Sequence, residues 1–270
     1  MWQRIKTAIV LIIIVGIALF ASQSAVLFAP LLFIGAVIGA YEWTKLMPKW
    51  RMTIRFVLLE AVIVIVALWA DMLWVGWWVA SLAIWLMAMF WVGSFPERTE
   101  RWYGKHLAAI GVIVLTAAIT AMFYLWQQSP WWLMYVFLLV WCADSGAYFV
   151  GRKLGRRKMA PSVSPNKSVE GLLGGLVTGL LVVGYISIYK LELTGSALAA
   201  FVALSAVTIL VSVLGDLFES MLKRRAGIKD SGTILPGHGG ILDRIDSLLS
   251  ATPVFAFGFW GLLHMGWMVS

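Results

Sequence analysis

The chain consists largely of long apolar segments, and this pattern restricts the folds that it can adopt. Each segment holds about 20 residues with few charges, the length that an α-helix needs to cross a bilayer. The segments lack the alternation of apolar and polar residues that is typical of membrane β-strands. Hydrophobic residues make up 61% of the 270 and charged residues 13%, unlike the balance of soluble domains. The sequence therefore predicts an all-α, polytopic integral membrane protein.

Short polar turns separate nine apolar segments, and we expect each to form a membrane-spanning helix. Only Asp71 divides the third segment from the fourth. The nine predicted helices cover residues 7–22, 25–43, 54–70, 73–95, 107–126, 131–150, 171–189, 196–219 and 248–269. We divide this single membrane domain into an N-terminal scaffold, 1–130, and a C-terminal half, 131–270, that carries the candidate catalytic residues.

The positions of Lys and Arg orient this set of helices. With nine spans, the N-terminus and the loops after spans 2, 4, 6 and 8 share one side. These segments hold all of the 21 Lys and Arg residues except Lys190. Because cytoplasmic loops are enriched in Lys and Arg, the pattern predicts a cytoplasmic N-terminus. It also argues against reading the first span as a cleaved signal peptide, since an even number of spans would break the segregation.

The net charge of +8 has a simple interpretation in a membrane protein. Positive loops are attracted to anionic lipid, so membrane lipids are the expected contacts. Nucleic acid is not an expected partner, because the sequence has no soluble basic domain to bind it. The single cysteine, Cys142, excludes an internal disulfide. The sequence leaves the oligomeric state open, and a homodimer is compatible with it.

Residues 220–246 depart most strongly from the apolar pattern. They combine acidic and histidine side chains with five cations and several glycines. Ionisable groups are expensive to place near lipid and usually mark ion binding or chemistry. Carboxylates, cations and exposed backbone amides are the groups that bind a nucleoside triphosphate and its metal. This segment is therefore the main candidate site.

Acidic residues also occur near the predicted cytoplasmic ends of three helices. Spacings of three and four residues place the members of a group on one helix face. The groups are Asp216, Glu219, Ser220 and Lys223 on the eighth helix, Asp243 and Asp246 at the start of the ninth, and Asp144 on the sixth. We expect these side chains to converge near the membrane boundary.

Mg²⁺ is the cation that such hard oxygen ligands favour, usually with substrate phosphates and water completing its shell. We expect Asp216 and Asp243 to be the leading ligands and Asp144 and Asp246 the next candidates. A second cation is compatible with four carboxylates. The alternative is that the aspartates only form ion pairs that hold the helices together.

Glycines precede the last helix in the sequence L-P-G-H-G-G at 235–240. Glycine permits positive φ and lets backbone amides approach an anion closely. We expect His238, Gly239 and Gly240 to bind phosphate. The alternative is that a tight turn before the helix requires the glycines.

Two further polar stretches lie between the sixth and seventh helices. The run G-R-K-L-G-R-R-K at 151–158 offers cations, including Arg152, to lipid or nucleotide phosphates. The alternative is that the run only reflects the enrichment of cytoplasmic loops in Lys and Arg. Lys167, in the polar turn 164–168, stands apart from it and is the better candidate for a specific contact.

Three glycines, Gly171, Gly175 and Gly179, recur at a spacing of four along the seventh helix. Small residues at this spacing let helices approach closely. We therefore predict helix packing here, in preference to a nucleotide-binding loop, since the Lys and Ser/Thr of such a loop are missing.

The pattern S-x-L-K-R-x4-K-D-x-G-x2-L-P-x-H-G-G-I-x-D-R-I-D at 220–246 resembles the signature of the phosphatidate cytidylyltransferases, or CDP-diacylglycerol synthases. The runs A-D-S-G-A-Y-F-V-G-R-K at 143–153 and S-P-N-K-S-V-E-G at 164–171 resemble the same family. The resemblance covers the C-terminal half well, whereas the N-terminal spans match only as apolar scaffold.

The resemblance implies an Mg²⁺-dependent enzyme that joins CTP to phosphatidate, giving CDP-diacylglycerol and pyrophosphate. It also implies a bacterial-type inner membrane and a site facing the cytoplasm. On this interpretation the catalytic residues are Asp216, Lys223, Lys229, Asp243, Arg244 and Asp246. The substrate-binding residues are Arg152, Lys167, Ser220, Arg224, His238, Gly239 and Gly240.

Other classes of membrane protein fit the sequence less well. A transporter would predict interrupted spans in two related halves, whereas the polar groups here lie in one half. A CDP-alcohol phosphotransferase would need an Asp-Gly pair followed by Ala-Arg and spaced aspartates. A lipid kinase would be distinguished by its use of ATP instead of CTP. A purely structural protein would leave residues 220–246 unexplained.

Overall fold

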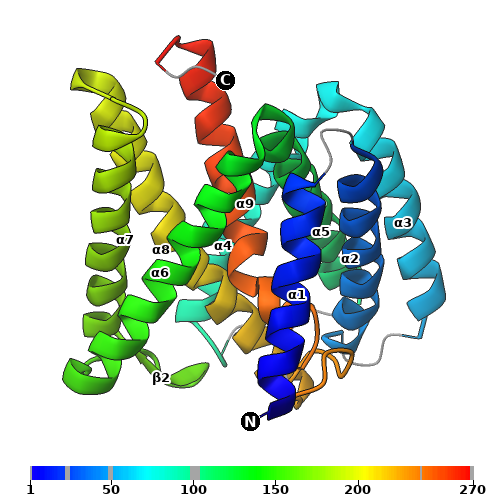
Figure 1. Ribbon diagram of the computed structural model, residues 1–270. Helices are drawn as coiled ribbons and strands as arrows, with labels where there is room; N and C mark the ends of the chain where they lie inside the picture. Colours follow the sequence, from blue (N-terminus) through cyan, green and yellow to red (C-terminus); the bar gives the residue numbers. More distant parts are fainter. Residues whose placement is uncertain (1, 22–24, 48–50, 98–103, 238, 268–270) are drawn as a thin grey trace.

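The apolar segments form α-helices that stand side by side in a bundle (Figure 1). This computed structural model describes residues 2–21, 25–47, 51–97, 104–237 and 239–267. The helices are α1 (Trp2–Phe20), α2 (Ala25–Lys45), α3 (Thr53–Trp69), α4 (Trp74–Gly93), α5 (Lys105–Gln128), α6 (Pro130–Leu154), α7 (Val169–Tyr189), α8 (Gly195–Ala226) and α9 (Leu242–His264).

Two smaller elements complete the described chain. The 3₁₀ turn η1, Asp71–Leu73, joins α3 to α4, and an antiparallel hairpin of β1 (Lys158–Ala160) and β2 (Ser164–Ser168) joins α6 to α7. The hairpin lies at the end of the bundle where α1 begins and where α8 leads into α9 (Figure 1). We call this the polar end; α9 finishes at the opposite, far end.

Seven helices are long and apolar enough to cross a membrane: α2, α4 with its preceding turn, α5, α6, α7, α8 and α9. Helix α3 is not among them, because its 17 described residues are fewer than the about 20 that a span needs. The described residues thus support an all-α, polytopic membrane protein. The count of nine spans and the orientation stay predictions.

Local sequence explains several helix ends. The Ser129 hydroxyl accepts a hydrogen bond from Trp131 N at 3.3 Å before α6, and the Ser168 hydroxyl accepts one from Gly171 N at 3.1 Å before α7. Both serines satisfy amides that the helix itself leaves unpaired. Gly227, at φ 71°, ends α8 in the left-handed conformation that glycine adopts at little cost.

The predicted limits of the last two helices are wrong. We expected the ninth helix at 248–269, but α9 runs from Leu242 to His264. The eighth, expected to end at 219, continues to Ala226. Charged residues at these ends interrupt the apolar pattern without interrupting the backbone hydrogen bonds of a helix. The candidate site residues are consequently held on helices more than on loops.

Aromatic side chains fill the bundle on both sides of its middle. Trp132 of α6 packs on Phe259 of α9 with ring centroids 4.4 Å apart toward the far end. In the second buried cluster, Trp85 of α4 meets Phe218 of α8 edge to face at 5.6 Å. Rings of this size bury large apolar areas. Together with the largely buried α5 and α9, they position the end of α8 beside the start of α9.

The predicted packing role of the glycines in α7 is confirmed. A Cβ on Gly175 would lie 2.6 Å from the carbonyl oxygen of Ala143, and one on Gly171 would lie 3.0 Å from that of Ala147. A Cβ on Gly179 would collide with Ile209 of α8. Since backbone atoms form the obstacle on α6, the two helices cannot accommodate a larger residue without moving apart.

Replacing Gly175 by valine should lower the free energy of unfolding by about 1–3 kcal/mol, the usual cost of overpacking. Gly184→Val is the matched control, because nothing lies within 4 Å of a Cβ at that position of the same helix. Thermal unfolding of both variants in detergent checks this. Equal melting temperatures for the two would contradict the packing argument.

Candidate active site

A glycine turn lies between α8 and α9 at the polar end (Figure 1). Leu235 N donates to the carbonyl oxygen of Gly239 at 2.9 Å, and Gly237 and Gly239 have φ of 77° and 85°. Side chains other than glycine rarely adopt such angles. A turn therefore accounts for part of the glycine pattern, as the alternative interpretation expected. His238 lies outside the described residues.

Asp243, in the first turn of α9, organises the chain that precedes it. Its Oδ1 accepts a hydrogen bond from Lys223 Nζ at 2.8 Å. Its Oδ2 accepts from Ser231 N at 2.9 Å and from Gly240 N at 2.8 Å. Charge-assisted bonds of this kind are stronger than neutral ones. One carboxylate thus ties α8, the loop and α9 together.

Glu219 shares the same cation. Its Oε2 lies 2.6 Å from Lys223 Nζ, one turn along α8. The three side chains are little exposed: 15% for Lys223, 3% for Glu219 and 5% for Asp243. Buried charges persist only when they are paired and hydrogen-bonded. We describe these three residues as the buried ion cluster.

A second, more open group lies around Lys167. The Lys167 ammonium is 2.5 Å from Asp216 Oδ2, and the exposed fractions of the two side chains are 26% and 29%. The other oxygen of Asp216 accepts a hydrogen bond from the Ser220 hydroxyl at 3.2 Å. The predicted helix face of Asp216 and Ser220 is confirmed. The group also brings together residues 49 positions apart in the sequence, 167 and 216.

Two further aspartates act on this open group. Asp144 of α6 is within electrostatic range of Lys167 and Asp216. Asp246 of α9 is within range of Asp216, Glu219 and Lys167. Acidic groups from three helices thus lie close enough to interact electrostatically, and Glu219 connects the open group to the buried ion cluster. Repulsion among these carboxylates makes the site attractive to cations.

The hairpin holds Lys167 in place. Glu170, at the start of α7, accepts hydrogen bonds from Arg156 N at 2.9 Å and Arg157 N at 3.1 Å and pairs with the Arg157 side chain. Arg224 Nε of α8 donates to the carbonyl oxygen of Val163 in the hairpin turn at 3.3 Å. Arg224, which we predicted to bind substrate, thus also attaches the hairpin to α8.

The remaining predicted cations lie at the surface. Arg152 is exposed near the end of α6, and its guanidinium donates to the Tyr148 hydroxyl at 3.3 Å. Lys229 and Arg244 are also exposed. Their roles stay predictions.

Within the described residues, no group of three or more His, Cys, Asp or Glu side chains is arranged to hold a metal ion by itself. Any Mg²⁺ here would need oxygens from a substrate or water. That is the usual way in which proteins bind this ion with nucleotides.

Sequence reasoning missed two contributors to the site. Glu42 of α2, in the predicted scaffold, accepts a hydrogen bond from Leu242 N at 2.8 Å. Ser231 of the loop donates from its backbone to Asp243. A carboxylate near the end of an apolar segment is a signal that would have drawn attention to Glu42, whereas the sequence offers no comparable signal for Ser231.

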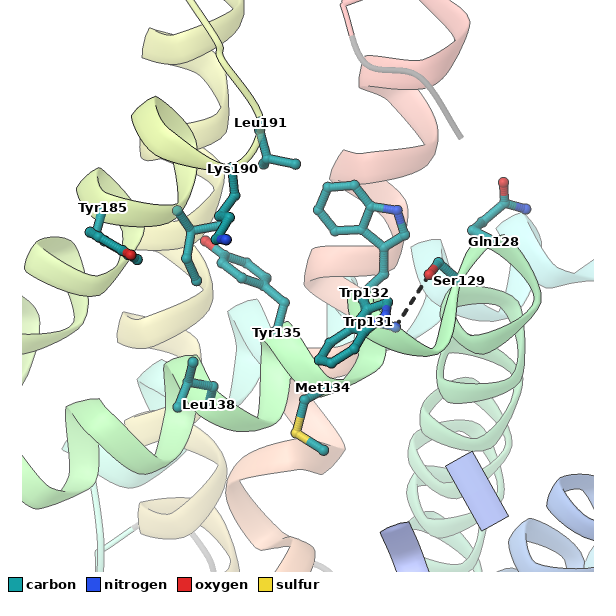
Figure 2. Close-up of a pocket in the computed structure, with 11 residues that line it drawn as sticks. Gln128, Ser129, Trp131, Trp132, Met134, Tyr135, Leu138, Tyr185, Lys190 and Leu191 are labelled. Atoms are coloured by element: carbon teal, nitrogen blue, oxygen red, sulfur yellow. Dashed lines mark hydrogen bonds between the residues drawn. The ribbon is translucent and has the colours of Figure 1, made fainter. Parts of the chain in front are cut away.

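A cavity of about 760 Å³ lies elsewhere, at the far end between the start of α6 and the end of α7 (Figure 2). Its walls include Trp131, Trp132, Tyr135 and Tyr185, with Lys190 among the lining residues. The described lining residues include none of the predicted site residues. The cavity is therefore separate from the candidate active site.

The polar end, with its paired lysines and carboxylates on an apolar bundle, has the groups of a membrane enzyme that handles phosphates. The model of the cytidylyltransferase family matches residues 2–260, and the chain belongs to this family. In an alignment 292 positions long it is 39% identical to the phosphatidate cytidylyltransferase of Haemophilus influenzae, covering 97% of this chain and 99% of that protein. It is 40% identical to the phosphatidate cytidylyltransferase of Pseudomonas aeruginosa, covering 98% of both. The protein of the same name from Bacillus subtilis is 46% identical over 134 residues.

Lys223→Met should lower the free energy of unfolding by about 3 kcal/mol, because two buried carboxylates lose their shared cation. Adding Glu219→Gln removes one of these charges, so the double variant should be more stable than Lys223→Met alone. Unfolding in detergent measures both. The exposed Lys229→Met serves as control and should change stability by less than about 0.5 kcal/mol. A further loss in the double variant would contradict the cluster as described.

Proposed function

We propose that this protein transfers the cytidylyl group of CTP to phosphatidate, forming CDP-diacylglycerol and releasing pyrophosphate. The observation that carries the proposal is the open group around Lys167 and Asp216, where carboxylates from three helices meet a cation at the end of an apolar bundle. Relatives named phosphatidate cytidylyltransferase, similar over nearly the whole chain, support it.

The reaction needs little covalent help from the protein. A phosphate oxygen of phosphatidate attacks the α-phosphorus of CTP, a new P–O bond forms, and the bond between the α-phosphorus and the bridging oxygen breaks. Pyrophosphate leaves with that electron pair. Since the nucleophile is already anionic, no general base is required. Alignment of the two substrates and neutralisation of their charge supply the rate enhancement.

The carboxylates of the open group are hard oxygen ligands, the kind that Mg²⁺ favours. We propose that Asp216 would hold the ion together with triphosphate oxygens and water, that the nearby charges of Asp144 and Asp246 would favour the cation, and that the bound ion would neutralise charge on the triphosphate. Asp243 already accepts three hydrogen bonds, and a carboxylate accepts about four. We therefore assign Asp243 chiefly to holding the loop, with one site left for a metal contact.

Cations at the polar end supply the remaining charge. Lys167 is partly exposed and lies where an incoming phosphate would compete with Asp216 for its ammonium. Lys229, Arg244 and Arg152 are exposed around the same end and are proposed to contact phosphates of CTP, phosphatidate or the departing pyrophosphate. A homodimer is compatible with this assignment.

We also propose nine spans, with the N-terminus in the cytoplasm, in an inner membrane of the bacterial type. Phosphatidate keeps its acyl chains in lipid and its phosphate at the interface, whereas CTP is cytosolic. A site at the cytoplasmic end of the bundle meets both requirements. The segregation of Lys and Arg supports this orientation.

Purified protein with phosphatidate, CTP and Mg²⁺ should release pyrophosphate and form a CDP-lipid. Asp216→Asn and Lys167→Met should each lower kcat/KM for CTP by about 100-fold or more, since the first removes a ligand of the cation that neutralises the triphosphate and the second removes a positive charge that contacts phosphate. Lys190→Met, at the far end, is the control and should keep the wild-type rate. Chelation of Mg²⁺ should abolish activity. Equal turnover of ATP, or full activity in Asp216→Asn, would contradict the proposal.

Single cysteines can test the orientation. In a Cys142→Ala background, Lys190→Cys should react with a membrane-impermeant maleimide in intact cells. Lys158→Cys, in the hairpin, should react only after the membrane is made permeable. The opposite pattern would reverse the topology, and labelling of both in intact cells would show that the two positions share the outer side.

A further inference from the structure

Glu42, a carboxylate in the N-terminal half, belongs neither to the buried ion cluster nor to the open group around Lys167. It lies near the polar end of α2, and its exposed fraction is 0%. Its Oε2 accepts hydrogen bonds from Leu242 N at 2.8 Å and from the Ser231 hydroxyl at 3.4 Å. Burying a carboxylate this completely costs much free energy unless hydrogen bonds of this kind compensate for the lost water. Its partners all lie in the segment that precedes or begins α9.

The contact with Leu242 caps the N-terminus of α9. Leu242 is the first residue of the helix, and the side chain of the preceding residue, Ile241, makes no capping hydrogen bond. The first amides of a helix need an external acceptor, and a negative charge there is favourable. Glu42 supplies both from another helix. Asp243 follows directly, so the same contact fixes where that carboxylate stands.

The loop also fits around the Glu42 side chain. A Cβ on Gly232 would collide with the Glu42 carboxylate, and one on Gly240 would lie 2.5 Å from both of its oxygens. Neither glycine has a positive φ, so the requirement for glycine comes from space. The loop backbone therefore packs directly against Glu42.

Two carboxylates hold this loop from opposite ends of the sequence. The Ser231 hydroxyl donates to Glu42, and the Ser231 backbone N–H donates to Asp243. Gly240 packs on Glu42 and donates its backbone N–H to Asp243. Glu42 is itself fixed, because the neighbouring Trp43 donates from Nε1 to the carbonyl oxygen of Leu107 in α5 at 2.9 Å. The loop is thus attached to the N-terminal half of the bundle.

We propose that Glu42 is a positioning residue for cytidylyl transfer. By accepting hydrogen bonds from the Leu242 amide and the Ser231 hydroxyl, it holds the loop and the first turn of α9 in the conformation in which Asp243 binds Lys223 and the loop amides and Asp246 lies near the open group. The catalytic part of this inference rests on the proposed function. The N-terminal half then contributes to the site directly, beyond its predicted role as scaffold.

Three substitutions separate this role from simple filling of space. Glu42→Gln keeps one oxygen for Leu242, and its amide group can replace Oε1, which faces no donor among the described residues. Glu42→Met keeps the volume without an acceptor, and Glu42→Asp keeps the charge but is one methylene too short. Glu60→Met is the control, because Glu60 is also fully buried in this half but bonds to Thr116.

Hydrogen exchange gives a readout that is independent of activity. Peptides covering 239–246 should exchange about tenfold faster in Glu42→Met and Glu42→Asp, since a hydrogen bond to a charged group is lost. Peptides from α6 and α7 should be unchanged. In cytidylyl transfer these two variants should lose at least about tenfold in kcat/KM for CTP. Glu42→Gln should stay within about threefold of the wild type, and the KM for phosphatidate should be unchanged.

Gly232→Ala should slow the wild-type enzyme and should cost much less when added to Glu42→Ala, because the carboxylate that it meets is gone and only the Gly240 Cα, 3.0 Å from the added Cβ, stays close. Additive losses would overturn the contact. Exchange and kinetics of Glu42→Met that match the wild type would overturn the proposal, as would faster exchange with normal turnover. If the wild type transfers no cytidylyl group, the proposed function fails, and the exchange data still decide whether Glu42 anchors the loop.

Discussion

The Lys223 ammonium lies between two buried carboxylates, 2.6 Å from Glu219 and 2.8 Å from Asp243. An ion cluster of this kind costs desolvation, and it is stable only while every member keeps its partners. The rest of the polar end depends on it. It joins the last turns of α8 to the first turn of α9, and Asp243 in turn holds two loop amides. A glycine-rich segment with little side-chain packing of its own is thereby kept in one conformation.

Close packing of α6 on α7 determines the other side of the site. Gly171 and Gly175 place the backbones of the two helices in contact, and the hairpin between the helices must begin and end where they do. Arg224 then attaches the hairpin turn to α8. As a consequence Lys167, on the second strand of the hairpin, lies beside Asp216 and pairs with it. Apolar packing inside the membrane thus sets the geometry of a charged site at its edge.

The sequence was sufficient for features that depend on local pattern, and insufficient for those that depend on distant contacts. Apolar length located the helices, and spacing placed Asp216 and Ser220 on one face. The start of α9 was predicted too late because hydropathy treats charged residues as loop, although they continue the helix. The contact between Glu42 and Leu242 spans 200 residues, and no periodicity encodes it. The pairing of Lys167 with Asp216 likewise follows from tertiary packing.

The two lysine–aspartate pairs differ in a way that suits different tasks. Lys223 and Asp243 are 15% and 5% exposed, so separating them would leave uncompensated charge in a poorly solvated place. Lys167 and Asp216 are 26% and 29% exposed, and pairs that water reaches are worth little, about 0–1 kcal/mol. On the proposed function, an arriving triphosphate with its cation would therefore replace the second pair at small cost, since phosphate would take the ammonium and the cation the carboxylate. The first pair, which is less exposed, would then keep holding the loop during that exchange.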